Sequence, residues 1–534
     1  MKAVIEESYK KAKYSSAFLT TSLFLYLTIS VLTWMSGVGP RNGHLVALFV
    51  PMAAFITSLI ANRNLIVRIN KLAKNIHRFC KQANPIYYIL FISLLFFIIW
   101  IASYFHAYST FSLPTWDAGI YGNIIFNSSI GKFFYSSVLE KNHLGEHFSP
   151  IMIIFIPLYL IKSDIRWILV VQSLTYCSVP VLLYRLSKIY TKDINIRFFV
   201  SILLGISWFL YVPMRSAIDF TFHPSSIAAP FILIAFIFME EGKYIKMLIT
   251  LCGIILFKEN TMFVSIGFGL YLIFKHKKIK LGLALVLIGS MIMLFLIKLV
   301  IPFFSMNGYS KLERFGIFQD AGLKLKYIIH LLLPLFFLPI LFWRYGVIFL
   351  PAVFQNIIVS YQPMYSSQYH YDDLTSPLLF ACMPGIIIVE LLPFLRKLIF
   401  TDFKLTLVPI FALLLCFSKP SPLMSLALNP ITNLHIELDN ELSILTSKFK
   451  NEKIYLQSPL FTHINHSPSQ DFKFCNERKK FKKGTLIAIA PNASLSHYNI
   501  KNLDQCFFSL KSDNNLLEVK GFKNLSVFQL KKDY

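Results

Sequence analysis

Charged side chains are scarce in this chain, and acidic ones are the scarcest. Asp, Glu, Lys and Arg together make up 15% of the 534 residues, with 27 acidic against 52 basic side chains. A soluble domain carries about 25% charged residues, so the composition excludes an ordinary soluble protein. The sequence also contains no P-loop, no Rossmann glycine fingerprint and no Cys-x-x-Cys pair. Nucleotide-driven pumping and a structural zinc site therefore have no support from motifs.

Apolar residues, in contrast, are abundant. They make up 55% of the chain, and the mean hydropathy is +0.59. Apolar runs recur, and we expect about thirteen membrane spans of ~20 residues each. The first run, 17–35, is long and lacks an Ala-x-Ala exit, so it is typical of an anchor rather than a cleaved signal. The net charge of +25 does not indicate nucleic acid, because the Lys and Arg residues lie in short segments between apolar runs, where they set topology.

These basic segments predict how the chain is threaded. The lysines of the first 13 residues and the basic cluster 63–81 place the N-terminus in the cytoplasm, with a helical hairpin of 17–36 and 44–62 between them. The next helix, 87–107, then leads out to an extracytoplasmic loop, 108–150. Later basic turns are placed inside at 185–197, 240–246, 275–280, 344 and 396–397. The opposite turns are placed outside at 215–223, 258–260, 306–324 and 361–375. The apolar stretch 151–161 is too short to cross comfortably and is expected to be re-entrant or interfacial.

The chain divides into three predicted regions. Residues 1–82 form the transmembrane hairpin and basic linker, and 83–419 form the main transmembrane module. After about residue 420 the long apolar runs give way to strand-like pieces at 453–457, 485–490 and 525–530, which predicts a small α/β domain of roughly 100 residues over 420–534 on the extracytoplasmic side. Its two cysteines, Cys475 and Cys506, form either a disulfide in an oxidising compartment or two unpaired thiols.

Asp117 is the first candidate catalytic residue. It stands in Trp116-Asp117-Ala118-Gly119-Ile120-Tyr121, soon after an apolar run, so it lies at the mouth of a membrane helix. A carboxylate beside the bilayer is costly unless it has a role. Transfer of a sugar to a hydroxyl needs a base for the acceptor proton, and a positioned carboxylate supplies one. The alternative is a helix-capping Asp.

Two further acid-and-histidine pairs fall on the same predicted side. Glu146 and His147 follow in the same loop, where they form a second acid/base pair, a set of divalent-metal ligands, or a solvated loop pair. Asp219 and His223 precede another span, as substrate-binding groups or as a helix end.

Lys258 and Glu259 interrupt the apolar stretch 247–274, where a charge is expected to face a cavity or a partner. Lysine suits a lipid phosphate as a compact point charge, and Arg215 is a second candidate for that role. The alternative is a pair of charges that neutralise each other at a hairpin turn.

The last polar segment is Tyr369-His370-Tyr371-Asp372-Asp373, just before the span 377–390. His370 and Tyr371 could stack on a sugar or hold a phosphate. The alternative is an aromatic belt with polar loop residues.

These segments follow one another in a recognisable order. They are Asp117-x-Gly119-Ile120-Tyr121, Gly145-x-His147-Phe148-Ser149-Pro150, Pro157-Leu158-Tyr159, Gln172, Asp219-Phe220-x-Phe222-His223-Pro224, Lys258-Glu259, and His370-Tyr371 with Pro377. In this order the chain resembles the bacterial and archaeal membrane proteins grouped as domain of unknown function 2079. That family is similar to the GT-C superfamily, whose members are polytopic glycosyltransferases that use polyprenyl-phosphate-linked sugars.

The resemblance implies an all-α polytopic protein of the prokaryotic inner or plasma membrane, with a GT-C-like helical bundle and the small α/β domain outside. It implies an inverting transfer of sugar from a polyprenyl-phosphate donor to a lipid, glycan or protein acceptor, with no nucleic acid involved. Asp117 is the expected base, with Glu146 and His147 beside it and with these three as ligands if Mg²⁺ or Mn²⁺ takes part. The expected substrate and phosphate groups are Arg215, Asp219, His223, Lys258, Glu259, His370 and Tyr371.

Two other classes compete with the enzyme. A transporter or flippase for a lipid-linked or acidic solute would use the same polar rim as a binding cavity, but transporters usually show repeat symmetry and ionisable groups near the bilayer midplane. A scaffold that binds envelope partners would leave the charges at 258–259 unexplained.

Overall fold

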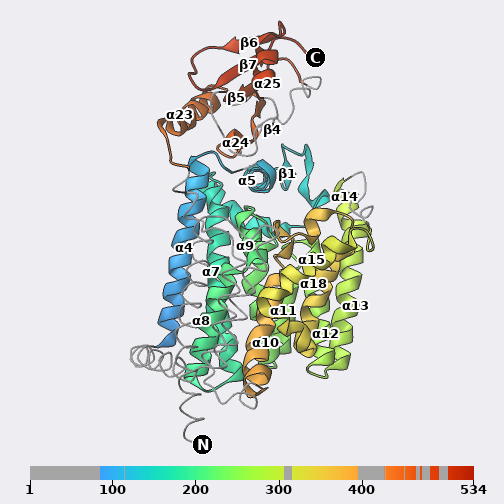
Figure 1. Cartoon of the computed structure of the whole chain (residues 1–534). Coiled ribbons are helices and arrows are strands. Elements are labelled where there is room, and N and C mark those ends of the chain that lie inside the picture. The colour runs from blue at the N-terminus through green and yellow to red at the C-terminus, as the bar shows by residue number, and fades with distance from the viewer. Residues whose placement is uncertain are drawn as a thin grey trace, which may run out of the picture.

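The structure, a computed structural model, describes residues 84–113, 115–305, 315–394, 426, 429–449, 452–464, 470–471, 481–491 and 503–533. Figure 1 shows a body of roughly parallel helices with a smaller, strand-containing unit at one end. The predicted N-terminal hairpin, the basic cluster 63–81 and the predicted boundary near residue 420 lie outside the described residues.

Long apolar helices form the body. Among the described residues, four segments are long and apolar enough to cross a membrane: α4 (Pro85–Ser109), α7 (Arg166–Tyr190), Ile279–Ser305 and Thr375–Phe394. The third joins α13 (Ile279–Phe295), η6 (Leu296–Val300) and α14 (Ile301–Ser305), and the fourth contains α19 (Thr375–Gly385) and η12 (Ile386–Leu391). A fifth candidate is α8 (Ile194–Leu210) with α9 (Val212–Asp219), a pair bent by 50°. The larger number of spans expected for the whole chain stays a prediction.

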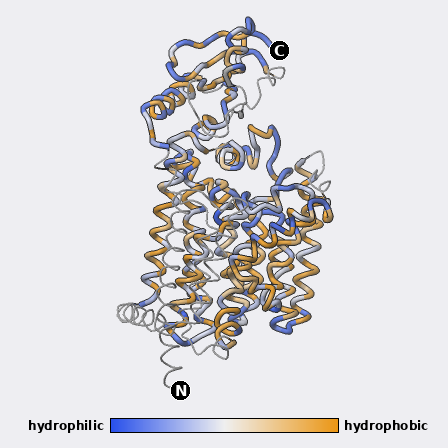
Figure 2. The backbone as a smooth tube through the Cα atoms, viewed as in Figure 1, coloured by the Kyte–Doolittle hydropathy of each residue, from blue (hydrophilic) through white to orange (hydrophobic). Residues whose placement is uncertain are grey.

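Burial separates the outer helices from the central one. The most apolar window of α4 has a mean hydropathy of 2.4, yet only 17% of it is buried inside the protein, whereas 72% of the window in Thr375–Phe394 is buried. Exposed apolar side chains on this scale would be unfavourable in water. Helix α4 therefore faces lipid, and α19 lies at the centre of the body. Figure 2 shows the resulting hydrophobic band along the helices, with hydrophilic segments at both ends. The chain is an integral membrane protein.

Shorter helices complete the body. They are α5 (Ile120–Ser129), η3 (Pro150–Phe155), α6 (Ile156–Ile161), η4 (Ser226–Ala228), α10 (Ala229–Glu240), α11 (Tyr244–Ile254), η5 (Glu259–Thr261), α12 (Met262–Phe274), α15 (Ala321–Leu332), η8 (Leu333–Leu335), α16 (Leu338–Leu341), α17 (Trp343–Gly346), η9 (Val347–Phe349), α18 (Leu350–Ile357), η10 (Gln362–Tyr365) and η11 (His370–Asp372). The elements η3 and α6 have 6 residues each. Together they span only about 21 Å, against the ~30 Å of the hydrocarbon.

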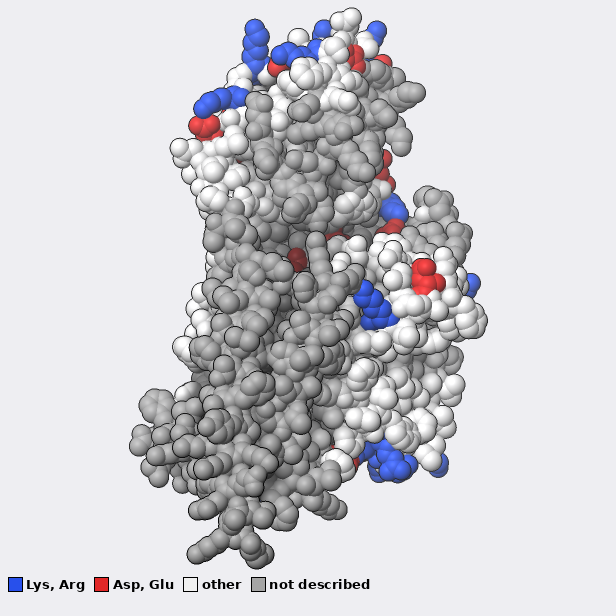
Figure 3. Space-filling model, viewed as in Figure 1, with Lys and Arg blue, Asp and Glu red and all other residues white. Residues whose placement is uncertain are grey.

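Side-chain contacts sort the turns between helices into two groups. At one end, Asp117 pairs with His223 and His147 with Glu259, which ties together the turns after α4, α9 and α11. At the other end, Glu240 pairs with His276 and Lys275 with Glu390. Figure 3 shows Lys and Arg side chains gathered at the lower edge of the described face, below a nearly uncharged belt. Which end faces the cytoplasm stays a prediction.

The loop after α4 also contains a small hairpin, in which β1 (Tyr135–Ser136) pairs antiparallel with β2 (Lys141–Asn142). A one-turn helix, η2 (His143–Gly145), follows it directly. Gly145 is required here by packing, because a Cβ on it would lie 2.6 Å from the backbone N of Ser305 at the end of α14. The hairpin is thus anchored on the end of a membrane helix.

The C-terminal unit, as we call the described residues from 429 onward, is built on one mixed sheet. Its strand order is β4-β3-β5-β7-β6, with parallel pairs on one side and antiparallel pairs on the other. The elements are α23 (Asn433–Lys448), β3 (Ile454–Leu456), α24 (Ser458–Phe461), β4 (Gln470–Asp471), β5 (Leu486–Ile489), α25 (Leu503–Lys511), β6 (Leu516–Val519) and β7 (Ser526–Leu530). Cys506 is disulfide-bonded, and its predicted partner, Cys475, lies outside the described residues.

Alternation along the strands gives this sheet two buried faces. Leu486 and Ala488 pack with α23 in one hydrophobic cluster, while Ile487 and Ile489 pack with α25 in another. This is the pattern expected of a sheet covered on both sides. Phe111, two residues after the end of α4, belongs to the first cluster and is completely buried. The C-terminal unit therefore packs directly on the helical body.

Candidate active site

Asp117 lies in a distorted turn between α4 and α5. In this turn, η1 (Thr115–Gly119), Trp116 has an extended backbone, and Asp117 has φ 66° and ψ −87°. A positive φ is uncommon outside glycine, and such a conformation costs of order 1–3 kcal/mol and persists only where the surroundings impose it. Residues strained in this way cluster at active sites. The backbone conformation of Asp117 therefore makes it a candidate active-site residue.

His223 is the direct partner of Asp117. Its Nε2 lies 3.2 Å from Oδ1 of Asp117, and its ring stacks on His370, with centroids 3.6 Å apart and planes 15° from parallel. The backbone N of His223 donates to Oε1 of Gln172 at 3.1 Å, and Nε2 of Gln172 donates to the carbonyl of Thr221 at 2.8 Å. Helix α7 therefore fixes the turn that presents His223.

The surroundings keep Asp117 ionised. Burial raises the pKa of Asp117, but nearby His223, Lys258 and His147 outweigh burial and hold the pKa below its ordinary value of 3.8. The side chain keeps 25% of its surface exposed. A carboxylate that is ionised and reachable from outside can accept a proton from a bound hydroxyl.

Lys258 and Glu259 have separate partners although they are adjacent in the chain. Glu259 Oε1 lies 2.7 Å from His147 Nδ1, and its Oε2 accepts from the backbone N of Phe148 at 3.0 Å. Lys258 has an extended backbone, and its charge counters the effect of burial on the pKa values of both Asp117 and Asp373. Glu259 thus ties the loop after α4 to the helical body, and Lys258 supplies positive charge to the site.

The other predicted residues are arranged around this centre. Glu146 is partly exposed and pairs with Lys141 of its own hairpin at 2.5 Å. Arg215 is buried, its Nε lies 3.5 Å from Asp219 Oδ2, and its guanidinium lies 5.8 Å from the Trp100 ring centroid. One more aromatic ring continues the histidine stack, since the ring of Tyr371 lies 4.1 Å from that of His370.

Two adjacent carboxylates that were not among the predicted binding residues also belong to the site. Asp373 accepts a hydrogen bond from Ser225, and Tyr327 donates to Asp372 at 2.5 Å. Burial raises the pKa of Asp373 and raises that of Asp372 to about 7. The sequence does indicate that these two residues have a role: both carboxylates follow His370-Tyr371 at the mouth of a span, where charged side chains are costly.

Asp117, Glu146 and His147, the predicted metal ligands, face different partners. Asp117 contacts His223, Glu146 contacts Lys141, and His147 contacts Glu259. Within the described part of the chain, no group of three or more His, Cys, Asp or Glu side chains is arranged to hold a metal ion. These three residues therefore do not fit a shared metal, and we derive no step through one.

The fold has a solved counterpart. It is similar to the crystal structure of ArnT from Cupriavidus metallidurans bound to undecaprenyl phosphate, with a TM-score of 0.53, 11% sequence identity, and coverage of 83% of this chain and 97% of that one. At this identity the likeness concerns the fold alone. No curated protein matched the sequence.

A family model described as "Predicted membrane protein (DUF2079)" matches residues 107–386, more than half of the chain. The chain belongs to this family. The matched region begins just before the Asp117 turn and ends in η12, so it contains every predicted site residue named above.

Proposed function

We propose that this protein is a membrane glycosyltransferase that moves a sugar from a polyprenyl-phosphate donor to a hydroxyl of an envelope lipid, glycan or protein. The observation that carries the proposal is the Asp117 turn: a strained, ionised carboxylate in an ion pair with His223, with the buried cation Lys258 nearby. A base and a cation in one place are what this reaction needs. The GT-C fold supports the same class of reaction.

The proposed reaction is a single displacement with inversion. The acceptor oxygen forms a bond to the anomeric carbon of the sugar while the bond from that carbon to the phosphate oxygen breaks. The acceptor proton moves to the carboxylate of Asp117, and polyprenyl phosphate leaves with the bonding electron pair. General base catalysis of this kind contributes typically 10²–10⁴-fold.

The departing phosphate gains negative charge, and Lys258 is placed to stabilise it. Its charge lowers the pKa values of both Asp117 and Asp373, which supports this role. Stabilisation of developing charge is often the largest single catalytic contribution. The stacked rings of His223 and His370 border the same space and offer nitrogen atoms or a flat face to phosphate or sugar. Undecaprenyl phosphate in the ArnT crystal structure supports a polyprenyl lipid as the carrier.

The test compares envelope glycans and glycolipids by mass spectrometry in the parent, a deletion strain, and the deletion strain carrying Asp117→Asn at matched protein level. A suitable control is Asp193→Asn. Asp193 is exposed and caps α8, and Asn is as good a cap as Asp. We expect the deletion and Asp117→Asn to lose the same sugar and the control to keep it.

Other outcomes decide against this function. If Asp117→Asn restores the parent glycan profile, Asp117 is not the base. If the deletion instead abolishes movement of a lipid-linked sugar across the membrane while purified protein transfers no sugar, the protein is a transporter or flippase.

A further inference from the structure

A short helix of the C-terminal unit, α24, contacts the turn that carries Asp117. Thr115 N donates to Ser458 Oγ at 3.1 Å, and Thr115 Oγ1 donates to the Ser458 carbonyl at 2.8 Å. The two hydroxyl oxygens lie 3.0 Å apart. Both residues are buried, Thr115 completely and Ser458 with 8% of its surface exposed. A pair of buried polar side chains thus joins positions 343 residues apart in the chain.

The same helix also contacts the far end of the turn. A Cβ on Gly119 would lie 3.1 Å from the ring of Phe461, so the ring packs closely against the backbone there. Helix α24 therefore fixes the turn at both ends, Thr115 by hydrogen bonds and Gly119 by packing. Asp117, with its positive φ, lies between these two fixed points.

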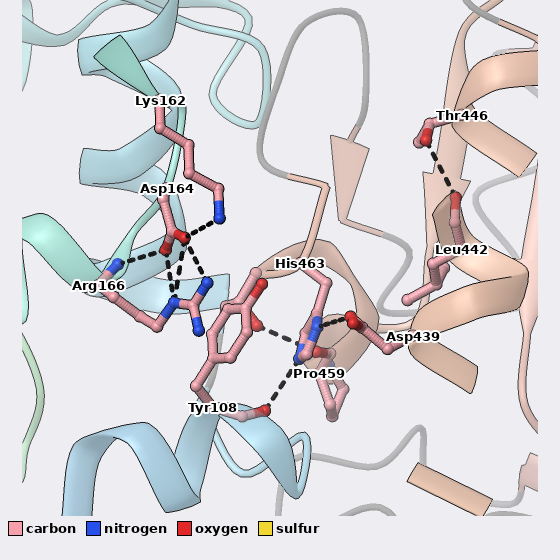
Figure 4. A network of polar contacts seen from close by, with 10 residues as sticks. Tyr108, Lys162, Asp164, Arg166, Asp439, Leu442, Thr446, Pro459 and His463 are labelled. Carbon is pink, nitrogen blue, oxygen red and sulfur yellow. Dashed lines mark hydrogen bonds and ion pairs between the residues drawn. The ribbon is translucent and has the colours of Figure 1, made fainter. Parts of the chain in front are cut away.

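His463 fastens α24 to the helical body, as Figure 4 shows. Its Nε2 bonds to the carbonyl of Tyr108 at 2.9 Å and its Nδ1 to Asp439 at 2.7 Å. The imidazole lies 4.1 Å from the ring of Tyr108 and 3.9 Å from that of Phe111. The Arg166 guanidinium lies 4.7 Å from the Tyr108 ring on α4. The C-terminal unit is thus held firmly enough to impose a conformation on the turn that it contacts.

We propose that Ser458 is a positioning residue for Asp117, and that the C-terminal unit acts through it to hold the carboxylate against His223. This proposal rests on the proposed function, in which Asp117 is the base. It assigns a catalytic purpose to a part of the chain that contributes no reacting group. Without Ser458 the turn can relax, and Asp117 separates from His223.

The first test needs no substrate. Carbodiimides modify protonated carboxyl groups, so labelling of the full-length protein in detergent across a pH range, read at Asp117 by peptide mass spectrometry, reports its protonation. In Ser458→Ala we expect labelling of Asp117 to begin at a higher pH than in the unmodified protein, because Asp117 moves away from His223. A second variant, Thr115→Val, removes the other hydroxyl of the pair with little change of shape and should give the same shift.

Lys453→Ala is the matched control. Lys453 also joins the C-terminal unit to the loop after α4, through Glu140 at 2.9 Å, and this link lies outside the turn Thr115–Gly119. A general loosening of the interface would affect this variant as much as Ser458→Ala. We expect its Asp117 labelling to match that of the unmodified protein.

The second test measures sugar transfer in cells at matched protein level. Misplacement of a catalytic group by about 1 Å can cost ~10²-fold, so we expect Ser458→Ala to lower transfer by roughly ten- to a hundredfold and Lys453→Ala to leave it unchanged. Normal labelling and normal transfer in Ser458→Ala would overturn the positioning role, as would equal losses in both variants. If Asp117→Asn itself keeps full transfer, the proposed function fails instead, whatever Ser458→Ala shows.

Discussion

Asp372→Asn should make the protein more stable at alkaline pH. Asp372 is almost completely buried, and burial raises its pKa to about 7, whereas an unfolded Asp titrates near 3.9. Between these values the unfolded chain releases a proton that the folded protein keeps, so stability falls as the pH rises and levels off above about 7. At roughly 1.4 kcal/mol per pKa unit the loss is on the order of 4 kcal/mol. Asparagine keeps the oxygen that accepts from Tyr327 and cannot ionise.

The measurement is unfolding in detergent micelles, followed by tryptophan fluorescence between pH 4 and pH 9. We expect the unmodified protein to lose stability steadily from pH 4 to pH 7, and Asp372→Asn to lose much less over the same range. Asp193→Asn, at an exposed helix cap, should follow the unmodified protein. Parallel curves for Asp372→Asn and the unmodified protein would refute the reasoning, because they would mean that Asp372 is ionised in the folded state or titrates as it does in the unfolded chain.

Three further predictions concern the site and its supports. Lys258→Met removes a cation that lowers the pKa of Asp117. The acidic limb of the transfer-versus-pH profile should therefore move to higher pH, and the rate should fall by about 10²–10³-fold. An acidic limb at the same pH as in the unmodified protein would contradict this prediction. Gly145→Ala places a Cβ 2.6 Å from the backbone N of Ser305 and should lower the unfolding free energy by about 1–3 kcal/mol. Gly253→Ala in α11 is the control: open space surrounds Gly253, so this substitution should raise the unfolding free energy by roughly 0.5–1 kcal/mol. Chelation by EDTA should leave transfer unchanged, and a loss that Mg²⁺ or Mn²⁺ restores would show that ligands outside the predicted set hold a metal.

The sequence predicted which turns meet, because apolar runs of known length and basic turns assign each polar segment to one end of the helices. The residues Asp117, His147, His223, Glu259 and His370 meet at one end as the alternation implied. Membrane class and family followed from equally simple patterns. These features depend on composition and on order along the chain, both of which a sequence displays directly.

Pairing within the site could not be predicted in this way. Lys258 and Glu259 suggest a mutual ion pair by adjacency, yet in extended backbone neighbouring side chains point to opposite sides, and each has other partners. The contact between Thr115 and Ser458 spans 343 residues, and no periodicity in either segment encodes it. The positive φ of Asp117 was equally hidden, because no pattern in the local sequence encodes it.

The contact between Thr115 and Ser458 can form only late in the synthesis of the chain. A ribosome that adds 5–20 residues per second needs roughly 20–70 s to travel the 343 residues between them. Throughout that interval the helices around Asp117 can already be in the membrane while α24 does not yet exist. A nascent or prematurely terminated chain would therefore contain the acid, the lysine and both histidines without the support that aligns them. If Ser458 positions Asp117 as proposed, the site becomes aligned only after α24 has been synthesised.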